Sequence, residues 1–280
     1  MFTFTLYKFR LKHLRKIILI GSVLSIIAIS ACQKVVNIDL NDASPNIVIE
    51  GVINNSPGPY VVKLSKTGSY FNAPILPPVS GAVVIISDNT GIADTLTEDS
   101  TGIYFTHKIA GIPGQIYTLK VLSEKVLYTA TSTMMSAVNI DSIGLEVTQR
   151  ISFGLRAGNR RDSTLTIHFL DPAAEKNYYR IKFIEKNLFN TASYRLYNDV
   201  YTNGEAIDLR VGRALKGDTD RIELISLDQG VYDYYRTLED ILRINPIFGS
   251  TPANPNTNLS NGALGYFGAV AITRKSIIVH

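Results

Sequence analysis

The feature that most constrains the fold is a period-two alternation of apolar and polar residues, which recurs in short segments along most of the chain. Successive side chains of a strand point to opposite faces, so such segments are typical of strands with one buried face. Residues 46–54 (NIVIEGVIN) place Ile47, Ile49 and Ile53 on one face. Turn signals such as the Ser-Pro-Gly at 56–58 separate the segments every eight to twelve residues or so. This rhythm predicts an antiparallel β-sandwich.

Other segments of the first half follow the same rule. In residues 59–68 we expect a buried face made of Tyr60, Val62 and Leu64. Residues 81–91 (GAVVIISDNTG) form a continuous β-branched run, which predicts a strand buried on both faces. Residues 100–109 align Ile103, Phe105 and Ile109, and residues 115–132 predict two strands around a turn at 123–125.

The rhythm breaks at residues 131–139 (TSTMMSAVN), which we interpret as a domain boundary. Beyond it, alternation predicts strands in segments 142–147, 163–170, 177–187, 220–227 and 262–273. Between Asp228 and Asn245, apolar residues recur every three or four positions, which predicts one amphipathic helix that Pro246 ends. The loop at 246–262 is long and rich in Pro and Asn, as functional or disordered loops are.

These patterns predict a mainly β protein with two domains. Residues 45–133 are expected to form an N-terminal Ig-like or transthyretin-like antiparallel sandwich. Residues 134–280 are expected to form a second β-rich domain with the one amphipathic helix.

The chain begins with a leader that is unlike the rest. Residues 1–16 carry five basic residues and no acidic one, and residues 17–30 are almost wholly apolar. A helix of fourteen such residues reaches about 21 Å, whereas the hydrocarbon core of a bilayer is roughly 30 Å thick. The pattern therefore predicts a secretory signal peptide rather than a membrane-spanning helix.

The leader ends at the single cysteine of the chain. Ile29-Ser30-Ala31-Cys32 resembles the lipobox of bacterial lipoproteins, in which cleavage falls between Ala31 and Cys32 and the cysteine receives acyl chains. Each buried CH₂ contributes about 0.8 kcal/mol, so two or more chains anchor a protein stably. We therefore predict a signal peptide at 1–31 and a lipidated tether at 32–44. Gln33, where an aspartate would favour the inner membrane, favours the outer one. The alternative is an ordinary signal peptide with an incidental cysteine.

The charge of the mature chain gives no reason to expect a nucleic-acid partner. Without the leader, 23 Lys and Arg face 24 Asp and Glu, a net charge of −1. The basic isoelectric point of the whole chain thus comes from its targeting signal.

No set of residues predicts catalysis. His168 alternates with Thr164 and Thr166 onto the same face of its predicted strand, which we expect to be solvated. His107 is expected to be packed or at a rim, and His280 is the last residue. No serine lies in a Gly-x-Ser-x-Gly motif, and no motif pairs two carboxylates. We therefore assign no catalytic residues and expect no enzyme.

Metal sites are not predicted either. Residues 39–50 have acids at both ends of a calcium-loop spacing, but Ala43 replaces a ligand and Ser44 replaces the required glycine. Zinc needs clustered Cys and His, which the sequence lacks. No cofactor is implied.

Two surfaces leave a choice between structure and binding. Arg156, Arg160 and Arg161 fall in a predicted hairpin tip, which is either simply solvated or contacts an anion or a partner. Eight tyrosines between Tyr178 and Tyr235 are either strand residues or a binding surface. Ligand-binding residues stay unassigned.

Several stretches in order resemble one family. They are IVIEGVI, YVVKLSKTGSYF, PPVSGAVVIISDNTG, GIYF, GQIYTLKV, DPAAEKNYYRIKF, VYDYYRTLED and NLSNGALGYFGAV. Their order resembles the lipoproteins of domain of unknown function 4249 from Bacteroidetes. The resemblance implies an outer-membrane lipoprotein of a kind often encoded beside a TonB-dependent receptor, and carries over no site residue except Cys32. The first acid after Cys32 is Asp39, so the periplasmic and cell-surface faces both stay open.

The function expected from all this is a non-enzymatic accessory protein. It would be bound to the outer membrane through acyl chains on Cys32 and would bind a ligand or dock with a TonB-dependent receptor. One alternative is a structural or adhesive envelope lipoprotein, and another is a lipid-anchored hydrolase.

Overall fold

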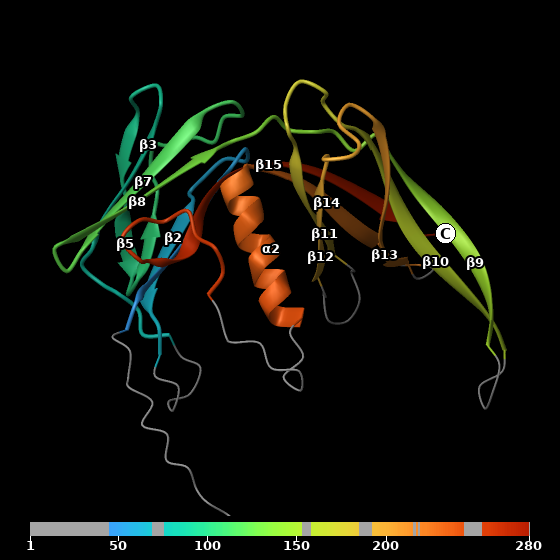
Figure 1. The fold of residues 1–280 in the computed structure, drawn as a ribbon, viewed down its shortest axis with the longest axis horizontal. Helices are drawn as coiled ribbons and strands as arrows, with labels where there is room; N and C mark the ends of the chain where they lie inside the picture. Colours follow the sequence, from blue (N-terminus) through green and yellow to red (C-terminus); the bar gives the residue numbers. More distant parts are fainter. Residues whose placement is uncertain are drawn as a thin grey trace, which may run out of the picture. The chain divides into compact units, whose positions relative to one another are not determined.

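The computed structural model describes residues 45–68, 76–152, 158–184, 192–214, 217, 219–243 and 254–279, with the backbone alone at 147–152, 158–162 and 214. The predicted signal peptide and tether lie outside these residues. The described chain is mainly β, with sandwich-like packing of sheets, which confirms the predicted fold class (Figure 1). Among the described residues, no helix has the length and apolar character needed to cross a membrane.

The largest sheet has eight strands, in the order β12-β11-β14-β15-β1-β2-β6-β5. Its strands are β12 (Ala192–Asn198), β11 (Tyr178–Ile184), β14 (Thr219–Leu227), β15 (Leu264–Ile278), β1 (Ile47–Asn54), β2 (Val61–Lys66), β6 (Ile103–Phe105) and β5 (Thr97–Ser100). Neighbouring strands are antiparallel except β1 and β15, which run parallel.

The described residues also form two smaller antiparallel sheets. One contains β4 (Ala93–Thr95), β3 (Val83–Asp88), β7 (Ile116–Ser123) and β8 (Val126–Thr133) in that order. The other contains β13 (Ala206–Ala214), β10 (Gly158–Leu170) and β9 (Ser142–Ser152). The β7–β8 hairpin turns at Glu124 and Lys125, which both have positive φ, as a two-residue turn matched to the strand twist requires.

Two hydrophobic cores lie between the sheets. The first includes Ile49, Ile86 and Leu119, and the second includes Leu165, Phe183 and Leu224. They separate between Met134 and Val138, within the segment where the sequence pattern breaks. However, the strand β15 serves both halves: residues 264–270 pair with β1, and residues 271–278 pair with β14.

A third cluster lies beneath helix α2 (Gln229–Arg243), which confirms the predicted amphipathic helix. The helix buries Val231 and Tyr232 against Ile225, Leu227 and Val270, which belong to the outer face of the large sheet. It contacts β15, β11 and β12 (Figure 1).

The predicted strand faces are partly right. Ile47, Ile49 and Ile53 are buried as expected, and so are Tyr60, Val62 and Leu64. The prediction that residues 81–91 are buried on both faces is wrong, because the outer face of the four-stranded sheet leaves Val83 48% exposed.

The predicted face of residues 100–109 is also wrong for its strand. Tyr104, with Val62 as its pairing partner, is 1% exposed, while Ile103 and Phe105 are only half-buried. The Tyr104 hydroxyl donates to the Val79 carbonyl at 3.3 Å and accepts from the Ala82 N–H at 3.1 Å, which satisfies its polar end inside the core.

Candidate ligand-binding face

Four cations gather on the outer face of the large sheet, beside α2. We call Arg180, Lys182, Arg221 and Arg274, together with Glu223, the basic sheet face. On β11 the residues Tyr179, Ile181 and Phe183 are buried. Because side chains alternate along a strand, the same pattern sends Arg180 and Lys182 to the opposite face.

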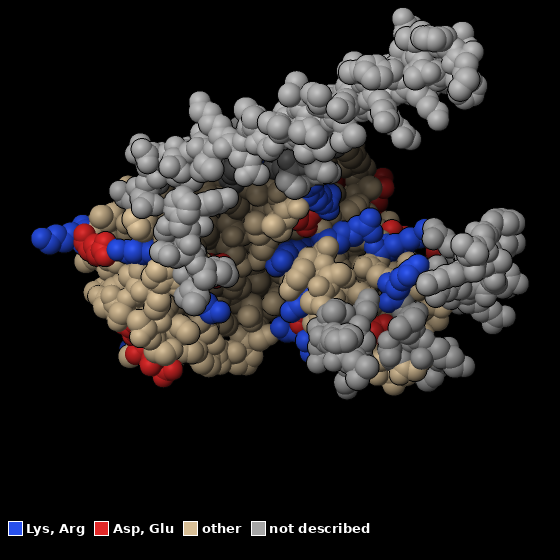
Figure 2. Space-filling model, turned by 90° about the horizontal axis from the view of Figure 1, so that it is seen from below, with Lys and Arg blue, Asp and Glu red and all other residues tan. Residues whose placement is uncertain are grey.

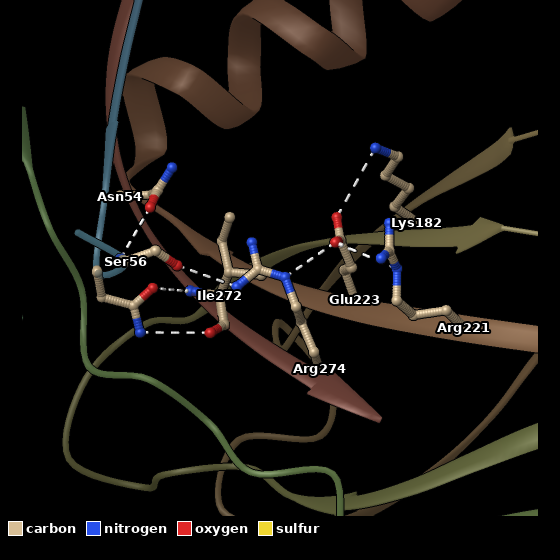
Figure 3. Close-up of polar contacts among 8 residues, drawn as sticks. Asn54, Ser56, Lys182, Arg221, Glu223, Ile272 and Arg274 are labelled. Carbon is tan, nitrogen blue, oxygen red and sulfur yellow. Dashed lines mark hydrogen bonds and ion pairs between the residues drawn. The ribbon is translucent and has the colours of Figure 1, made fainter. Parts of the chain in front are cut away.

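Glu223 is the centre of this face (Figure 3). Strand pairing places it between Lys182 on β11 and Arg274 on β15. The Arg274 Nε lies 3.0 Å from Oε1, the Arg221 Nε lies 3.7 Å from Oε1, and the Lys182 Nζ lies 3.8 Å from Oε2. The Glu223 side chain is 9% exposed, whereas those of the three cations are 29–52% exposed. One carboxylate therefore serves three cations, which leaves positive charge in excess.

The strand that carries Arg274 is held in place from the side. After β1 ends, the carboxamide of Asn55 continues the ladder: its Oδ1 accepts from the Ile272 N–H at 2.8 Å and its Nδ2 donates to the Ile272 carbonyl at 3.3 Å. The Arg274 Nη1 donates to Ser56 Oγ at 3.1 Å (Figure 3). The Arg274 guanidinium is therefore fixed at both the Glu223 and the Ser56 side.

Arg180 is held in a different way, by two aromatic rings. Its guanidinium carbon lies 3.9 Å from the ring centre of Tyr194 on β12 and 3.8 Å from that of Tyr235 on α2. Stacking of this kind orients a guanidinium and covers its faces. Within the part of the chain that the structure describes, this guanidinium donates no hydrogen bond.

The ring of Tyr235 is itself anchored. Its hydroxyl lies 2.6 Å from that of Tyr266 on β15, and the Tyr266 ring also packs against Tyr234 with centroids 4.5 Å apart. Burial raises the pKa of Tyr235 and of Tyr266, so both phenols stay neutral at physiological pH. The stack around Arg180 is therefore assembled from fixed parts.

Further positive charge lies close to this stack. Between β12 and α2 is a hollow of about 560 Å³, to which Tyr194, Arg195, Arg236 and Arg243 contribute together with Glu239 and Asp240. Figure 2 shows that Lys and Arg side chains form a band across part of the face viewed from below.

The tyrosines of the second half divide between packing and surface. Tyr179 is fully buried and donates to Asp171 Oδ1 at 2.6 Å, and Tyr178 packs against Tyr232 with centroids 4.9 Å apart. Tyr194 is 46% exposed and Tyr201 is 93% exposed. Most of these tyrosines pack within the fold, whereas Tyr194 is part of the solvent-exposed surface next to Arg180.

The two histidines of the described part, His107 and His168, lie where the sequence predicted them. His168 is on the solvated face of β10, where its side chain is 37% exposed and its Nδ1 lies 2.5 Å from Asp208 Oδ1. This pair and the ion pair of Arg210 with Glu146, at 2.8 Å, line a hollow of about 420 Å³ on the three-stranded sheet. His107 is exposed at a rim, and its ring contacts the Thr97 hydroxyl.

Several predicted residues fall outside the described part. These are Ala31 and Cys32 at the cleavage site, the tested calcium-loop positions before residue 45, Arg156 and His280. β9 and β10 form a hairpin, but Arg160 and Arg161 lie within β10, paired with Arg150 and Gln149, and not at the hairpin tip as predicted. Their side chains are not described. Among the residues that are described, no group of three or more His, Cys, Asp and Glu could hold a metal ion.

Sequence reasoning did not single out the basic sheet face. The parity of Arg180 and Lys182 was visible in the alternation of YYRIKF, and that of Arg221 and Glu223 in DRIELISL. What the pattern cannot give is that β11, β14 and β15 are neighbours, since the paired residues of these strands lie 37 to 59 positions apart in the sequence.

Comparison with known proteins gives one family. The model of a family described as domain of unknown function (DUF4249) matches residues 33–276. Among solved structures, the selenomethionine-substituted chicken interferon gamma receptor alpha chain is found at 10% identity, with 66% of this chain and 90% of that chain covered and a TM-score of 0.19. So low a TM-score carries no argument about this chain. No curated protein matches.

Proposed function

This chain belongs to the family of domain of unknown function DUF4249, and from this premise we propose that it is a lipid-anchored, non-enzymatic binding protein of the outer membrane. In this proposal it acts as an accessory to a TonB-dependent receptor, either by holding a ligand or by docking with the receptor.

Support for the anchor comes from the leader. A basic start, a short apolar segment and a lipobox-like ending at Cys32 together favour acylation of the cysteine. The family match begins at residue 33, directly after the residue expected to start the mature chain.

The observation that carries the binding role is the basic sheet face. Its cations stand on paired strands, and their positions are fixed by Glu223, Ser56 and the rings of Tyr194 and Tyr235. Side chains fixed before a ligand arrives lose little conformational entropy on binding, so such a face is suited to recognition.

The anchor and the partner can be tested on the full chain. Cys32→Ala should move the protein from the membrane fraction to the soluble fraction and abolish labelling by palmitate. A tagged wild-type protein, captured from gently solubilised membranes, should bring a TonB-dependent receptor with it. A Cys32→Ala protein that stays in the membrane would refute the anchor, and repeated capture without any receptor would refute the accessory role.

A structural or adhesive envelope protein is the second candidate, because one apolar row is exposed. Val83, Leu122 and Leu127 are neighbours across β3, β7 and β8 and are 48%, 45% and 47% exposed. Exposed apolar groups of this kind mark contact surfaces. Deletion of the gene separates the two candidates: an accessory protein gives a growth defect on particular nutrients, and an envelope protein gives a general one.

A further inference from the structure

The basic sheet face has both unused hydrogen-bond donors and unbalanced charge. We propose that it binds a phosphate group of its ligand, with Arg180, Lys182 and Arg274 as the contacting residues. The inference rests on the proposed binding function and adds the chemical class of the ligand.

The first step of the argument is Arg180. A guanidinium carries five N–H donors and stays charged at all physiological pH values. The rings of Tyr194 and Tyr235 lie against it at 3.9 and 3.8 Å, which removes water from its faces. No acceptor for its donors is found among the described residues, so the edges of the guanidinium are available to an oxyanion.

The second step is the proximity of further cations. Lys182 follows Arg180 on the same face of β11, about 7 Å along the strand, and its Nζ lies 6.0 Å from the ring centre of Tyr194. Arg274 and Arg221 share the Glu223 carboxylate with Lys182. In our proposal Glu223 is a positioning residue, since it holds Lys182 and Arg274 in place without facing the anion itself.

The third step is the count of charges. Of the four cations Arg180, Lys182, Arg221 and Arg274, the last three share one carboxylate within ion-pair distance, that of Glu223. A second carboxylate, that of Glu50, lies nearby on β1 and acts on Tyr235, so the excess is two positive charges. A monocarboxylate would neutralise one of these charges, whereas a phosphate monoester or diphosphate brings two or more. Arginine also matches the tetrahedral oxygens of phosphate through paired N–H donors, and lysine adds a compact charge.

Phosphate could reach this face from two sources, a soluble phosphorylated compound or the headgroup of a lipid. The test therefore has two arms, both with the purified full chain in detergent or reconstituted form. Inorganic pyrophosphate, titrated by calorimetry, represents the soluble source. Flotation with phosphatidic acid vesicles, compared with phosphatidylcholine vesicles, represents the lipid source.

We expect saturable binding in at least one arm, with pyrophosphate competing for the vesicles if the lipid is the source. Arg180→Leu should weaken that binding about tenfold or more, because it removes a charge-assisted contact. Arg180→Lys should lie between Arg180→Leu and wild type, since it keeps the charge but loses the planar fork. Circular dichroism checks the fold of each variant.

Arg210→Leu is the matched control. Arg210 lies on the three-stranded sheet, its side chain is 67% exposed, and the substitution removes the same charge. Equal weakening by Arg180→Leu and Arg210→Leu would show only diffuse attraction and would overturn the proposal. So would the absence of saturable binding in both arms at millimolar ligand. Binding of citrate as tight as that of pyrophosphate would overturn the assignment to phosphate.

The result separates cleanly from the test of the proposed function. Pyrophosphate binding is measured on pure protein and needs neither a receptor nor the acyl chains. If the receptor is absent from pull-downs but Arg180-dependent binding is found, the accessory role fails and the phosphate site stands. If a receptor is captured but pyrophosphate binding does not depend on Arg180, only the phosphate site is refuted.

Discussion

At the scale of single residues, ionised carboxylates of this protein hold its main chain in place. Asp94 Oδ2 accepts from the N–H groups of His107, Lys108 and Ile109 at 2.6, 2.6 and 3.1 Å. Glu98 accepts from the N–H of Gly81 at 2.9 Å, the N–H of Gly102 at 2.8 Å and the hydroxyl of Ser80 at 3.0 Å. These loops therefore depend on a negative charge, which acid removes.

Glu98 makes this dependence testable. Hydrogen bonds from the Gly81 and Gly102 N–H groups lower the pKa of Glu98 from 4.5 to about 2. A carboxyl whose pKa is lower in the folded than in the unfolded state contributes stability above the unfolded pKa, and this is lost as pH falls toward the folded pKa. Glu98→Gln should therefore be less stable than wild type near neutrality, with the difference shrinking between pH 4.5 and about 2.

Urea unfolding at several pH values measures this effect, with Asp99→Asn as the control at the exposed neighbouring residue. A constant difference between Glu98→Gln and wild type across the acid range would contradict the role of the ionised carboxylate.

At the scale of elements, β15 changes partners halfway along its length. Residues 264–270 pair with β1 and residues 271–278 with β14, so each half has one edge without a strand. Two asparagine carboxamides take that place. Asn55 pairs with both main-chain groups of Ile272, and Asn258 accepts from the Phe267 N–H at 3.1 Å and donates to its carbonyl at 2.7 Å.

Asn258→Leu should therefore destabilise the protein by about 2 kcal/mol, because it leaves two main-chain groups beside the core without partners. Chemical denaturation measures the loss. Asn203→Ala is the control, because Asn203 makes a single exposed hydrogen bond of 3.3 Å. An Asn258→Leu protein as stable as this control would show that water replaces the carboxamide.

One carboxylate, that of Asp228, links the start of helix α2 to strand β8. Asp228 Oδ1 caps the helix by accepting from the Val231 N–H at 2.8 Å, while Oδ2 accepts from the Ser132 hydroxyl at 2.5 Å and the Thr133 N–H at 2.9 Å. Asp228→Ala removes the cap and the link to β8 together, so we expect a loss of about 2 to 4 kcal/mol in the free energy of unfolding. Asp240→Ala, at an exposed position of the same helix, should have little effect in the same unfolding experiment.

The elements also show what the sequence could predict and why. The buried faces of β1 and β2 were predicted correctly because the residues that each strand buries stand at alternate positions. The prediction for β3 was wrong because β-branched residues stand at both its odd and its even positions, although only one face of the strand is covered. β12 and β13 were not predicted, and in β12 the reason is clear: its side chains are exposed or half-buried, so no buried face imposes a pattern on the sequence.

The same limit applies to the candidate site. The sequence showed cations at alternate positions of single strands, but a site needs the pairing of β11 with β14 and of β14 with β15. That pairing depends on contacts distant in sequence, which local alternation does not encode.

At the scale of the whole molecule, the sequence pattern breaks at a place that the largest sheet crosses. Strand β8 ends at Thr133, near the predicted domain boundary, and the two cores separate within the next few residues, although no boundary between domains is thereby established. Yet β15, far along the chain, pairs with β1 on one side of that boundary and with β14 on the other. Loss of either core removes the partner of half of this strand, so the two cores should be coupled in unfolding.

This coupling predicts one thermal transition for the two halves. Phe267, fully buried in the first core, and Phe183, 1% exposed in the second, are equivalent probes of the two cores. Phe267→Ala and Phe183→Ala should each cost about 3 to 5 kcal/mol, and each should lower the single calorimetric transition by about 2 to 4 °C per kcal/mol. Tyrosine near-ultraviolet circular dichroism should melt at the same temperature as the far-ultraviolet signal in both variants. If either variant instead splits the transition in two, with one half melting as in wild type, the shared strand does not couple the cores and each sandwich folds on its own.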